Sequence, residues 1–282
     1  MNDSHGKSII FRPKMKAKDF TISTYRSLLT ALKEQGYDFQ TVSDFAKNPA
    51  TRAVMLRHDV DARKNHSLEF ARIQKSEGIV GTYYFRIVPQ SFDETVIRQI
   101  SDMGHEIGYH YEDMAFTNGD PHKAIKLFDD HLGRLRKVAP IQSICMHGSP
   151  VSSFDNRDVW KHYHYRDFDI NVEPYFDIDF RKVFYLTDTG RRWDGFKVSV
   201  RDKVEDHFGL SFHSTQEVIA ALKAGTFPSQ VMFNFHPQRW TGNMRIWWQD
   251  AGVQLLKNSA KYWLIKWREK KTTRASGRAQ KV

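Results

Sequence analysis

Short apolar runs alternate with longer amphipathic segments along the chain. The short runs predict strands, and the longer segments have the periodicity of helices, several of which end at a glycine. The pattern predicts strands over residues 53–57, 80–88, 105–109, 142–146, 183–186 and 231–235, and helices over 21–35, 63–77, 92–103, 121–138, 215–224 and 244–267.

The order of these elements predicts an α/β protein in which helical crossovers join parallel strands. Polar residues follow several of the strands, and in barrels of this kind the chemistry gathers at the carboxyl ends of the strands. The chain has no Pro/Ser-rich linker and no internal repeat. We therefore expect one domain over residues 1–267, followed by a basic, disordered tail over residues 268–282.

The first strand ends on two aspartates, Asp59 and Asp61, separated by Val60. Residues two apart in a strand project from the same face, so the two carboxylates would point together. Like charges that close need a cation or a shared proton. On these residues alone, a strand-end turn with two solvated aspartates is the simpler interpretation. The downstream histidines favour a hydrolytic metal site instead: His105, His110, His147 and His236.

The composition is that of an ordinary globular protein, with 40% hydrophobic and 27% charged residues. The formal net charge is +10, but residues 268–282 contain six basic residues and one acidic residue and so carry half of it. The remainder of the chain is only mildly basic. This distribution argues against a dedicated nucleic-acid fold and leaves a nonspecific attraction to polyanions or to an anionic membrane surface.

The chain begins on polar residues and contains no apolar run as long as a membrane span, so we expect a cytoplasmic protein. Cys145 is the single cysteine, which excludes an internal disulfide framework. We expect its thiol to be buried.

Five motifs along the chain carry a family resemblance. They are RHDVD at 57–61, GTYYF at 81–85, GHEIGYH at 104–110, MHGSP at 146–150 and FNFHP at 233–237. In this order they resemble a divergent member of the polysaccharide deacetylase superfamily, the NodB-homology group also called carbohydrate esterase family 4. The resemblance covers roughly residues 50 to 240. It implies a deformed (β/α) barrel of about seven parallel strands, followed here by the C-terminal helix.

The same resemblance implies removal of N- or O-acetyl groups from sugars with a divalent metal, zinc first, with cobalt, nickel or manganese as alternatives. The first family motif supplies a base and a metal ligand, which implies Asp59 as the base and Asp61 as the ligand. The family usually has adjacent aspartates, whereas here Val60 separates them. The spaced form is similar to sugar deformylases that act on lipid-linked aminosugars. The reverse assignment, with Asp59 on the metal, stays open.

The second family motif provides two histidines four residues apart as metal ligands, which implies His110 as one of them. Met114 stands at the second position, and a thioether is a poor ligand for such an ion. Glu112, Asp113, His147 or water could fill the gap, and we favour His147. That residue could also be an ordinary loop histidine before a Gly-Ser-Pro turn.

His236 follows the strand at 231–235 and matches the late family histidine that acts as the general acid. An imidazole with a near-neutral pKa suits protonation of an amine. A capping or core histidine before a proline is the alternative. Further residues near predicted strand ends are candidates for substrate binding: Arg86, Asp188, Trp193 and Arg239. The arginines would read phosphate or carboxylate groups, and the tryptophan would stack on a sugar ring, although turn and core roles compete for Asp188 and Trp193.

The segment 244–267 contains several tryptophans and precedes the basic tail. It could be an interfacial anchor that gives peripheral membrane contact. We favour a final helix that closes the barrel, because Ile246, Val253 and the leucines of this segment resemble core residues.

The resulting expectation is a cytoplasmic, metal-dependent hydrolase. It would remove an acetyl or formyl group from the nitrogen of a sugar, such as a nucleotide- or lipid-linked precursor of a surface polysaccharide. A catalytically silent glycan-binding barrel and a hydrolase of a non-sugar C–N bond are the alternatives.

Overall fold

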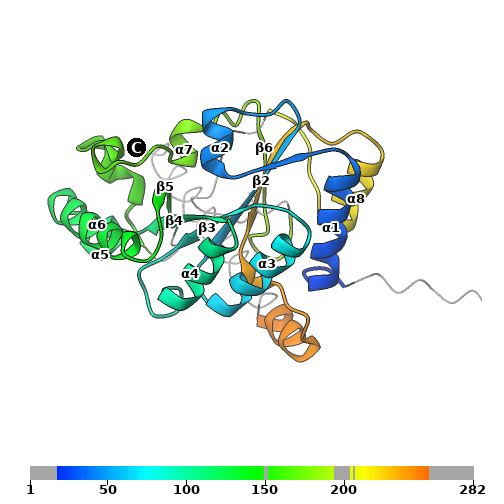
Figure 1. Cartoon of the computed structure of the whole chain (residues 1–282), viewed down its shortest axis with the longest axis horizontal. Coiled ribbons are helices and arrows are strands. Elements are labelled where there is room, and N and C mark those ends of the chain that lie inside the picture. Colours follow the sequence, from blue (N-terminus) through cyan, green and yellow to red (C-terminus); the bar gives the residue numbers. More distant parts are fainter. Residues whose placement is uncertain (1–17, 149–151, 194–203, 206, 254–282) are drawn as a thin grey trace, which may run out of the picture.

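A parallel sheet of seven strands forms the centre of the molecule (Figure 1). The structure is a computed structural model that describes residues 18–148, 152–193, 204–205 and 207–253. The strands follow the order β5-β4-β3-β2-β7-β6, and β1 pairs with β2 outside this path. They are β1 (Asp38–Gln40), β2 (Ala53–Val60), β3 (Thr82–Phe85), β4 (Glu106–Tyr111), β5 (Ile141–Met146), β6 (Phe184–Thr187) and β7 (Gln230–Phe235).

Strand β2 is the centre of the sheet and is buried over its whole length. Its first half pairs with β1, its second half pairs with β3, and β7 runs along its other edge. Every pairing is parallel. The carboxyl ends of the strands therefore meet at one edge, as in the predicted α/β barrel class.

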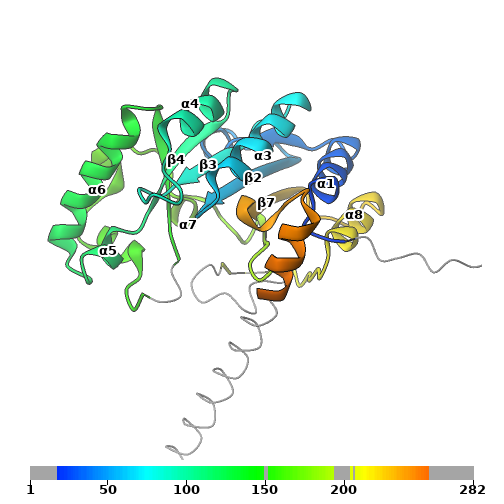
Figure 2. The ribbon, with the colours of Figure 1, turned by 90° about the horizontal axis from the view of Figure 1, so that it is seen from below.

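Helices surround this sheet (Figures 1 and 2). Oxygen-bearing side chains cap many of them at the N-terminus, among them Thr21, Asp93, Asp120 and Ser214. The helices are α1 (Ile22–Glu34), α2 (Val42–Lys47), α3 (Lys64–Ser76), α4 (Glu94–Asp102), α5 (Asp113–Phe116), α6 (Pro121–Arg136), α7 (Pro174–Asp177) and α8 (Thr215–Lys223), with 3-10 turns η1 (Asn156–Lys161), η2 (Tyr165–Phe168) and η4 (Pro237–Arg239).

The two faces of the sheet are packed differently. Leu56 points into the larger apolar cluster, which includes residues of α1 and α3. Met55 points the other way, into a smaller cluster with Tyr84, Cys145 and Met232. We call the face that carries this smaller cluster the inner face. Residues of odd number on β2 therefore belong to the inner face, and those that follow Met55 are polar.

Within the described residues, the strands and helices predicted from the apolar pattern are present, with two differences that affect the site. Strand β2 continues to Val60 instead of ending at Arg57, and β4 continues to Tyr111 instead of ending at Tyr109. Asp59 and His110 consequently lie within strands, where the backbone fixes them. The pattern did not predict β1, α2, α5 or α7, which have six residues or fewer.

The prediction of a closing C-terminal helix with a core face is wrong for its described part. Residues 244–253 are helical, but none of them is buried. Val253, expected in the core, is 50% exposed. The rest of the predicted helix and the tail over 268–282 lie outside the described residues. Among the residues that the structure describes, no helix is both long enough and apolar enough to cross a membrane.

Gly108 of β4 allows the inner face to close around Tyr84. A methyl group at Gly108 would collide with the Tyr84 ring and approach the Ser143 carbonyl oxygen to 2.9 Å. We expect Gly108→Ala to lower the free energy of unfolding by about 1–3 kcal/mol, as overpacking does. The matched control is Gly133→Ala in α6, where the added methyl meets nothing within 4 Å. It should raise stability by about 0.5–1 kcal/mol in urea denaturation. Equal stability of the two variants would contradict this account of the packing.

Candidate active site

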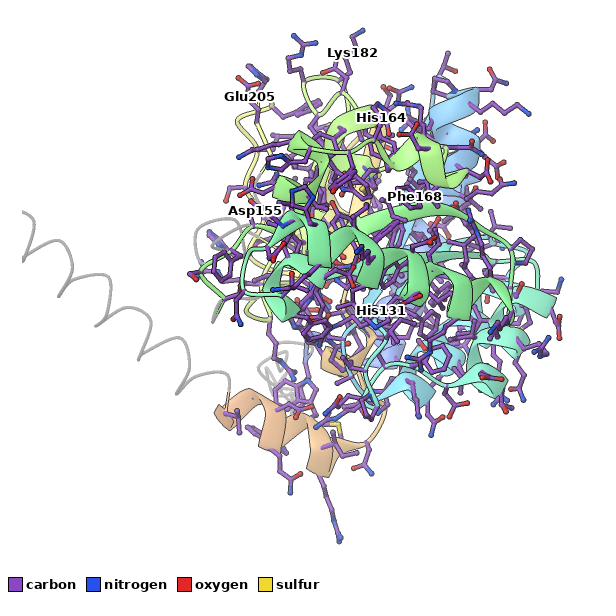
Figure 3. All side chains as sticks on the ribbon, turned by 90° about the vertical axis from the view of Figure 1, so that its left-hand side faces the viewer. His131, Asp155, His164, Phe168, Lys182 and Glu205 are labelled. Carbon is purple, nitrogen blue, oxygen red and sulfur yellow. The ribbon has the colours of Figure 1, made fainter. Side chains whose placement is uncertain are left out.

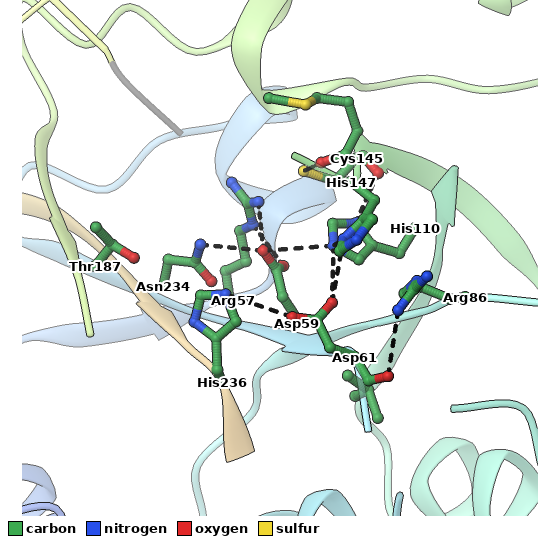
Figure 4. A network of polar contacts seen from close by, with 12 residues as sticks. Arg57, Asp59, Asp61, Arg86, His110, Cys145, His147, Thr187, Asn234 and His236 are labelled. Atoms are coloured by element: carbon green, nitrogen blue, oxygen red, sulfur yellow. Dashed lines mark hydrogen bonds and ion pairs between the residues drawn. The ribbon is translucent and has the colours of Figure 1, made fainter. Parts of the chain in front are cut away.

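The candidate site lies at the carboxyl ends of four strands. On these strands, the inner-face positions change there from the residues of the small apolar cluster to polar residues. Because side chains two apart share a face, each strand delivers a polar residue to the same space at its carboxyl end. Figure 4 shows the side chains of Arg57, Asp59, Asp61, His110, His147, Asn234 and His236 converging. The series are Met55, Arg57 and Asp59 on β2, followed by Asp61; Gly108 and His110 on β4, followed by Glu112; Cys145 on β5, followed by His147; and Met232 and Asn234 on β7, followed by His236.

Asp59 is held in a buried ion pair. Arg57 donates from Nε to one carboxylate oxygen at 2.9 Å and from Nη2 to the other at 2.7 Å, and Asn234 donates to the second oxygen at 3.1 Å. Burial opposes ionisation of Asp59, but the charge of Arg57 outweighs it, and the pKa of Asp59 falls to about 2. The carboxylate is therefore ionised at neutral pH and fixed in orientation.

Asp61 has a different environment. Its Oδ1 lies 3.6 Å from Nε2 of His110 and 3.2 Å from Nδ1 of His147, and these two nitrogens are 3.3 Å apart. The same oxygen is buried and makes no hydrogen bond of acceptable geometry to any described residue. Burial opposes ionisation, but the neighbouring imidazoles, His147 first, hold the pKa of Asp61 well below its usual range.

Asp61, His110 and His147 fit a divalent metal ion. Their three donor atoms lie within 4.8 Å of one another. One carboxylate oxygen with two imidazole nitrogens is a donor set that suits zinc and related ions. Asp59, His110 and Cys145 form a second group of this kind. It is the weaker candidate because Arg57 and Asn234 already occupy the oxygens of Asp59.

His110 is oriented as a ligand would be. Its Nδ1 lies 2.9 Å from the carbonyl oxygen of Cys145, which can only accept, so this nitrogen carries the hydrogen and Nε2 keeps its lone pair. Burial lowers the pKa of His110 to about 4, against the opposing charge of Asp59. The imidazole is therefore neutral at physiological pH, with its free nitrogen facing Asp61.

The structure places the alternatives for the third donor in different surroundings. Met114 lies on α5 and is 5% exposed within the larger apolar cluster. Asp113 bonds Tyr109 and His131. Glu112 accepts two hydrogen bonds from Arg86, both at 2.7 Å, although it also lies 3.8 Å from His147. Of these residues only His147 joins the donor group with Asp61 and His110.

His236 forms a dyad with Asp188. Nδ1 of His236 lies 2.6 Å from Oδ1 of Asp188, and Nε2 lies 3.9 Å from Asp61. Burial and the charge of Arg239 oppose protonation of His236, but Asp188 outweighs them and raises the pKa of His236 above its ordinary value. The dyad therefore presents a protonatable nitrogen toward Asp61.

Two predicted substrate contacts need correction. Asp188 is fully buried, and its oxygens accept hydrogen bonds from the backbone and ring of His236, from Arg239 and from Trp240. It positions His236 and has no face toward a sugar. Trp193 is 1% exposed, and its Nε1 donates to Thr215 at 2.8 Å, so its ring cannot stack on a ligand.

Arg86 and Arg239 lie at the rim with partly exposed side chains, 19% and 23% respectively. Each is paired with a buried carboxylate, Glu112 for Arg86 and Asp188 for Arg239. Arg86 also reaches the backbone oxygen of Asp61 at 3.5 Å. A contact with substrate stays a prediction for both residues.

The sequence analysis missed three residues of the site. Arg57 and Asn234 hold Asp59, and Gln238 donates to Oδ2 of Asp61 at 3.2 Å. The spacing could have revealed the first, because Arg57 stands two residues before Asp59 on one strand. Asn234 likewise stands two residues before His236. Gln238 lies on η4, and nothing in the sequence pattern indicated its contact.

Comparison with known proteins gives structural neighbours only. No protein-family model matches the chain, and a search of curated proteins finds no match. Among solved structures the chain is similar to a family 4 carbohydrate esterase from Bacillus anthracis, with 10% identity, coverage of 80% of this chain and 82% of that one, and a TM-score of 0.40. A Streptococcus mutans CE4 esterase shares 12% identity over 81% and 90% of the two chains, with a TM-score of 0.40.

A further neighbour is BA3943, described as a CE4 family pseudoenzyme from Bacillus anthracis. It shares 14% identity over 75% of this chain and 63% of that chain, with a TM-score of 0.40. The class of this protein, α/β with a parallel sheet, rests on its own strand pairing. The function that follows is argued from its own side chains.

The donor group predicts which residues control metal content. We expect the purified protein to contain near-stoichiometric divalent metal, zinc first, measured by mass spectrometry. Asp61→Ala, His110→Ala and His147→Ala should lose it, because each removes one of the three donors. His122→Ala, which removes an exposed histidine of α6, is the control and should keep it. Retention by His147→Ala together with loss in Glu112→Gln would assign the third position to Glu112.

Proposed function

We propose that this chain is a metal-dependent hydrolase that removes an N-acyl group, acetyl or formyl, from a sugar. One observation carries the proposal. A candidate metal group, an ionised carboxylate and a protonatable histidine lie together at the carboxyl edge of the sheet. The order of the motifs from RHDVD to FNFHP supports the sugar deacetylase class.

Asp61, His110 and His147 would hold the metal. A divalent ion there would supply Lewis-acid polarisation of the acyl carbonyl and would lower the pKa of water. The residues around the group prepare it for this task. The Cys145 carbonyl fixes the orientation of His110, and Gln238 fixes one oxygen of Asp61 while the other faces the two imidazoles.

Asp59 would receive the proton of the attacking water. Its Oδ2 lies 3.7 Å from Nε2 of His110, so the carboxylate borders the donor group without belonging to the set that includes Asp61. Arg57 and Asn234 keep it ionised and aligned. A carboxylate with a pKa of about 2 is a weak base, so its main contribution would be orientation of the water and brief acceptance of its proton.

His236 would donate a proton to the departing amine. Asp188 accepts from Nδ1, which leaves Nε2 as the nitrogen that faces the reacting atoms. Arg239 and Trp240 fix Asp188 in turn. Asp59 and His236 enter from β2 and β7, which are neighbours in the sheet, so the base and the acid can act on opposite ends of one acyl-nitrogen bond.

A second candidate function is a catalytically silent barrel that binds glycan. Met114 favours it, because the residue at the second position of the histidine motif is buried in the apolar core. His147 argues against the silent barrel, because it lies with Asp61 and His110 in the candidate metal group. The two functions differ in whether bond cleavage depends on Asp59.

Amide hydrolysis is the direct test. We expect the metal-loaded protein to release acetate or formate from N-acylated amino sugars, and Asp59→Asn to lower kcat roughly 10²–10⁴-fold because it removes the proton acceptor. Phe176→Ala, which alters an exposed residue of α7, is the control. Cleavage of cyclic amides alone would indicate a non-sugar substrate. Metal-independent glycan binding that Asp59→Asn leaves unchanged, without any cleavage, would establish the silent barrel.

Asp188→Asn separates positioning of His236 from contact with substrate. The substitution removes the charge that raises the pKa of His236, and His236 must be protonated to act as an acid. We therefore expect kcat to fall with little change in KM, and the alkaline limb of the pH profile to move to lower pH. A raised KM with an unchanged alkaline limb would restore Asp188 as a substrate contact.

A further inference from the structure

The helix over residues 244–253 presents large apolar side chains to solvent. Trp248 is 61% exposed and Met244 is 39% exposed, and their spacing of four residues puts them on one face of the helix. Figures 2 and 3 show this helix, drawn in orange, standing out from the body of the molecule. The side chains on its outward face do not pack into the hydrophobic core of the described protein.

The opposite side of the same helix is attached to the body. Trp247 donates from Nε1 to the backbone oxygen of Asp19 at 2.7 Å. Asp250 accepts two hydrogen bonds from Arg63, at 2.6 and 2.9 Å. The helix is thereby fixed with Met244 and Trp248 outward. Its single acidic residue is neutralised.

A lysine lies over the ring of the exposed tryptophan. Nζ of Lys18 lies 4.9 Å from the centre of the Trp248 ring and 5.6 Å from that of Trp247. Arg245 is exposed on the helix. We call Lys18, Met244, Arg245 and Trp248 the aromatic-basic surface. Residues 254–282, which lie outside the described residues, contain nine basic residues, one acidic residue and two further tryptophans.

We infer that the aromatic-basic surface binds the headgroup region of an anionic phospholipid membrane. Tryptophan and methionine beside lysine and arginine suit this region, where rings enter the interface while the cations meet lipid phosphates. A second copy of the chain fits less well, because two copies of this cationic surface would repel each other. A nucleic acid would use the cations and leave the apolar side chains without a role.

The surface is connected to the candidate active site. Arg63, which holds Asp250, also donates to the backbone oxygen of Gln238 at 3.2 Å, and the side chain of Gln238 donates to Asp61. A membrane bound there would lie beside the rim of the site. For the substrate, the inference rests on the proposed function: the acylated sugar would be carried on a lipid. The membrane contact itself needs no substrate.

Vesicle flotation of the full chain as purified, with no metal or substrate added, tests the contact. The probes are vesicles of phosphatidylglycerol and phosphatidylcholine in equal parts and vesicles of phosphatidylcholine alone. We expect binding to the anionic vesicles, weakened by salt. Trp248→Ala should lower the partition coefficient roughly tenfold, as loss of a partly buried aromatic side chain does. Lys18→Gln and Arg245→Gln should each lower it roughly fivefold on anionic vesicles only.

Phe176→Ala is the matched control, since Phe176 is an aromatic residue 51% exposed on α7, on the other side of the molecule in Figure 1. It should bind as the wild type does. Flotation equal in Trp248→Ala and wild type would overturn the inference, as would absence of wild-type flotation. A wild-type dimer in sedimentation that Trp248→Ala dissociates would overturn it too. Binding without any hydrolase activity would leave the membrane contact standing and remove the proposed function.

Discussion

The buried pair of Arg57 and Asp59 is the interaction on which the architecture of the site depends. Two charges within the most central strand of a sheet have lost their water, and such a pair is tolerated only with near-ideal geometry and further hydrogen bonds. The two donor contacts from Arg57 and the one from Asn234 meet this requirement. They let β2 continue as a regular strand through polar residues, which brings Asp61 to the edge of the sheet.

The other carboxylates of the site follow the same rule, with one exception. Glu112 is paired with Arg86, and Asp188 is paired with Arg239. Asp61 has no guanidinium partner for its carboxylate among the described residues, only imidazoles and an amide. The protein therefore neutralises Glu112 and Asp188 with its own arginines. Asp61 is the carboxylate whose charge a bound cation could neutralise.

Much of the fold could be predicted from the sequence, because buried parallel strands and amphipathic helices have strong patterns. The errors arose at residues whose role depends on the side chains packed around them, which the apolar pattern of the sequence does not indicate. Strand β2 was ended too early, at Arg57, since Asp59 looks exposed until its pairing is known. Trp193 was assigned to substrate from its type alone, although its packing decides its role. The segment from 244 was assigned to the core for the same reason.

The main residues of the candidate site could be predicted from the sequence, but most of the contacts between them could not. Asp59, Asp61, His110, His147 and His236 were identified from motifs, and the structure brings them together. The partners that set their charge and orientation, Arg57 and Asn234 among them, depend on the register between β2 and β7, where the two residues stand opposite each other. Register between strands distant in sequence has no local signal.

His147 directly follows β5, so the third donor of the metal group comes from a part of the chain distant from the other two. Two histidines one helical turn apart would form a local chelating element that a short peptide already contains. Here His110 lies on β4, Asp61 and His147 directly follow β2 and β5, and β5 lies at the border of the sheet. An ion bound among them would be a cross-link between the central strand and the border strand. Metal binding and the attachment of β5 to the sheet would then be thermodynamically linked, so that removing the ion would weaken that attachment.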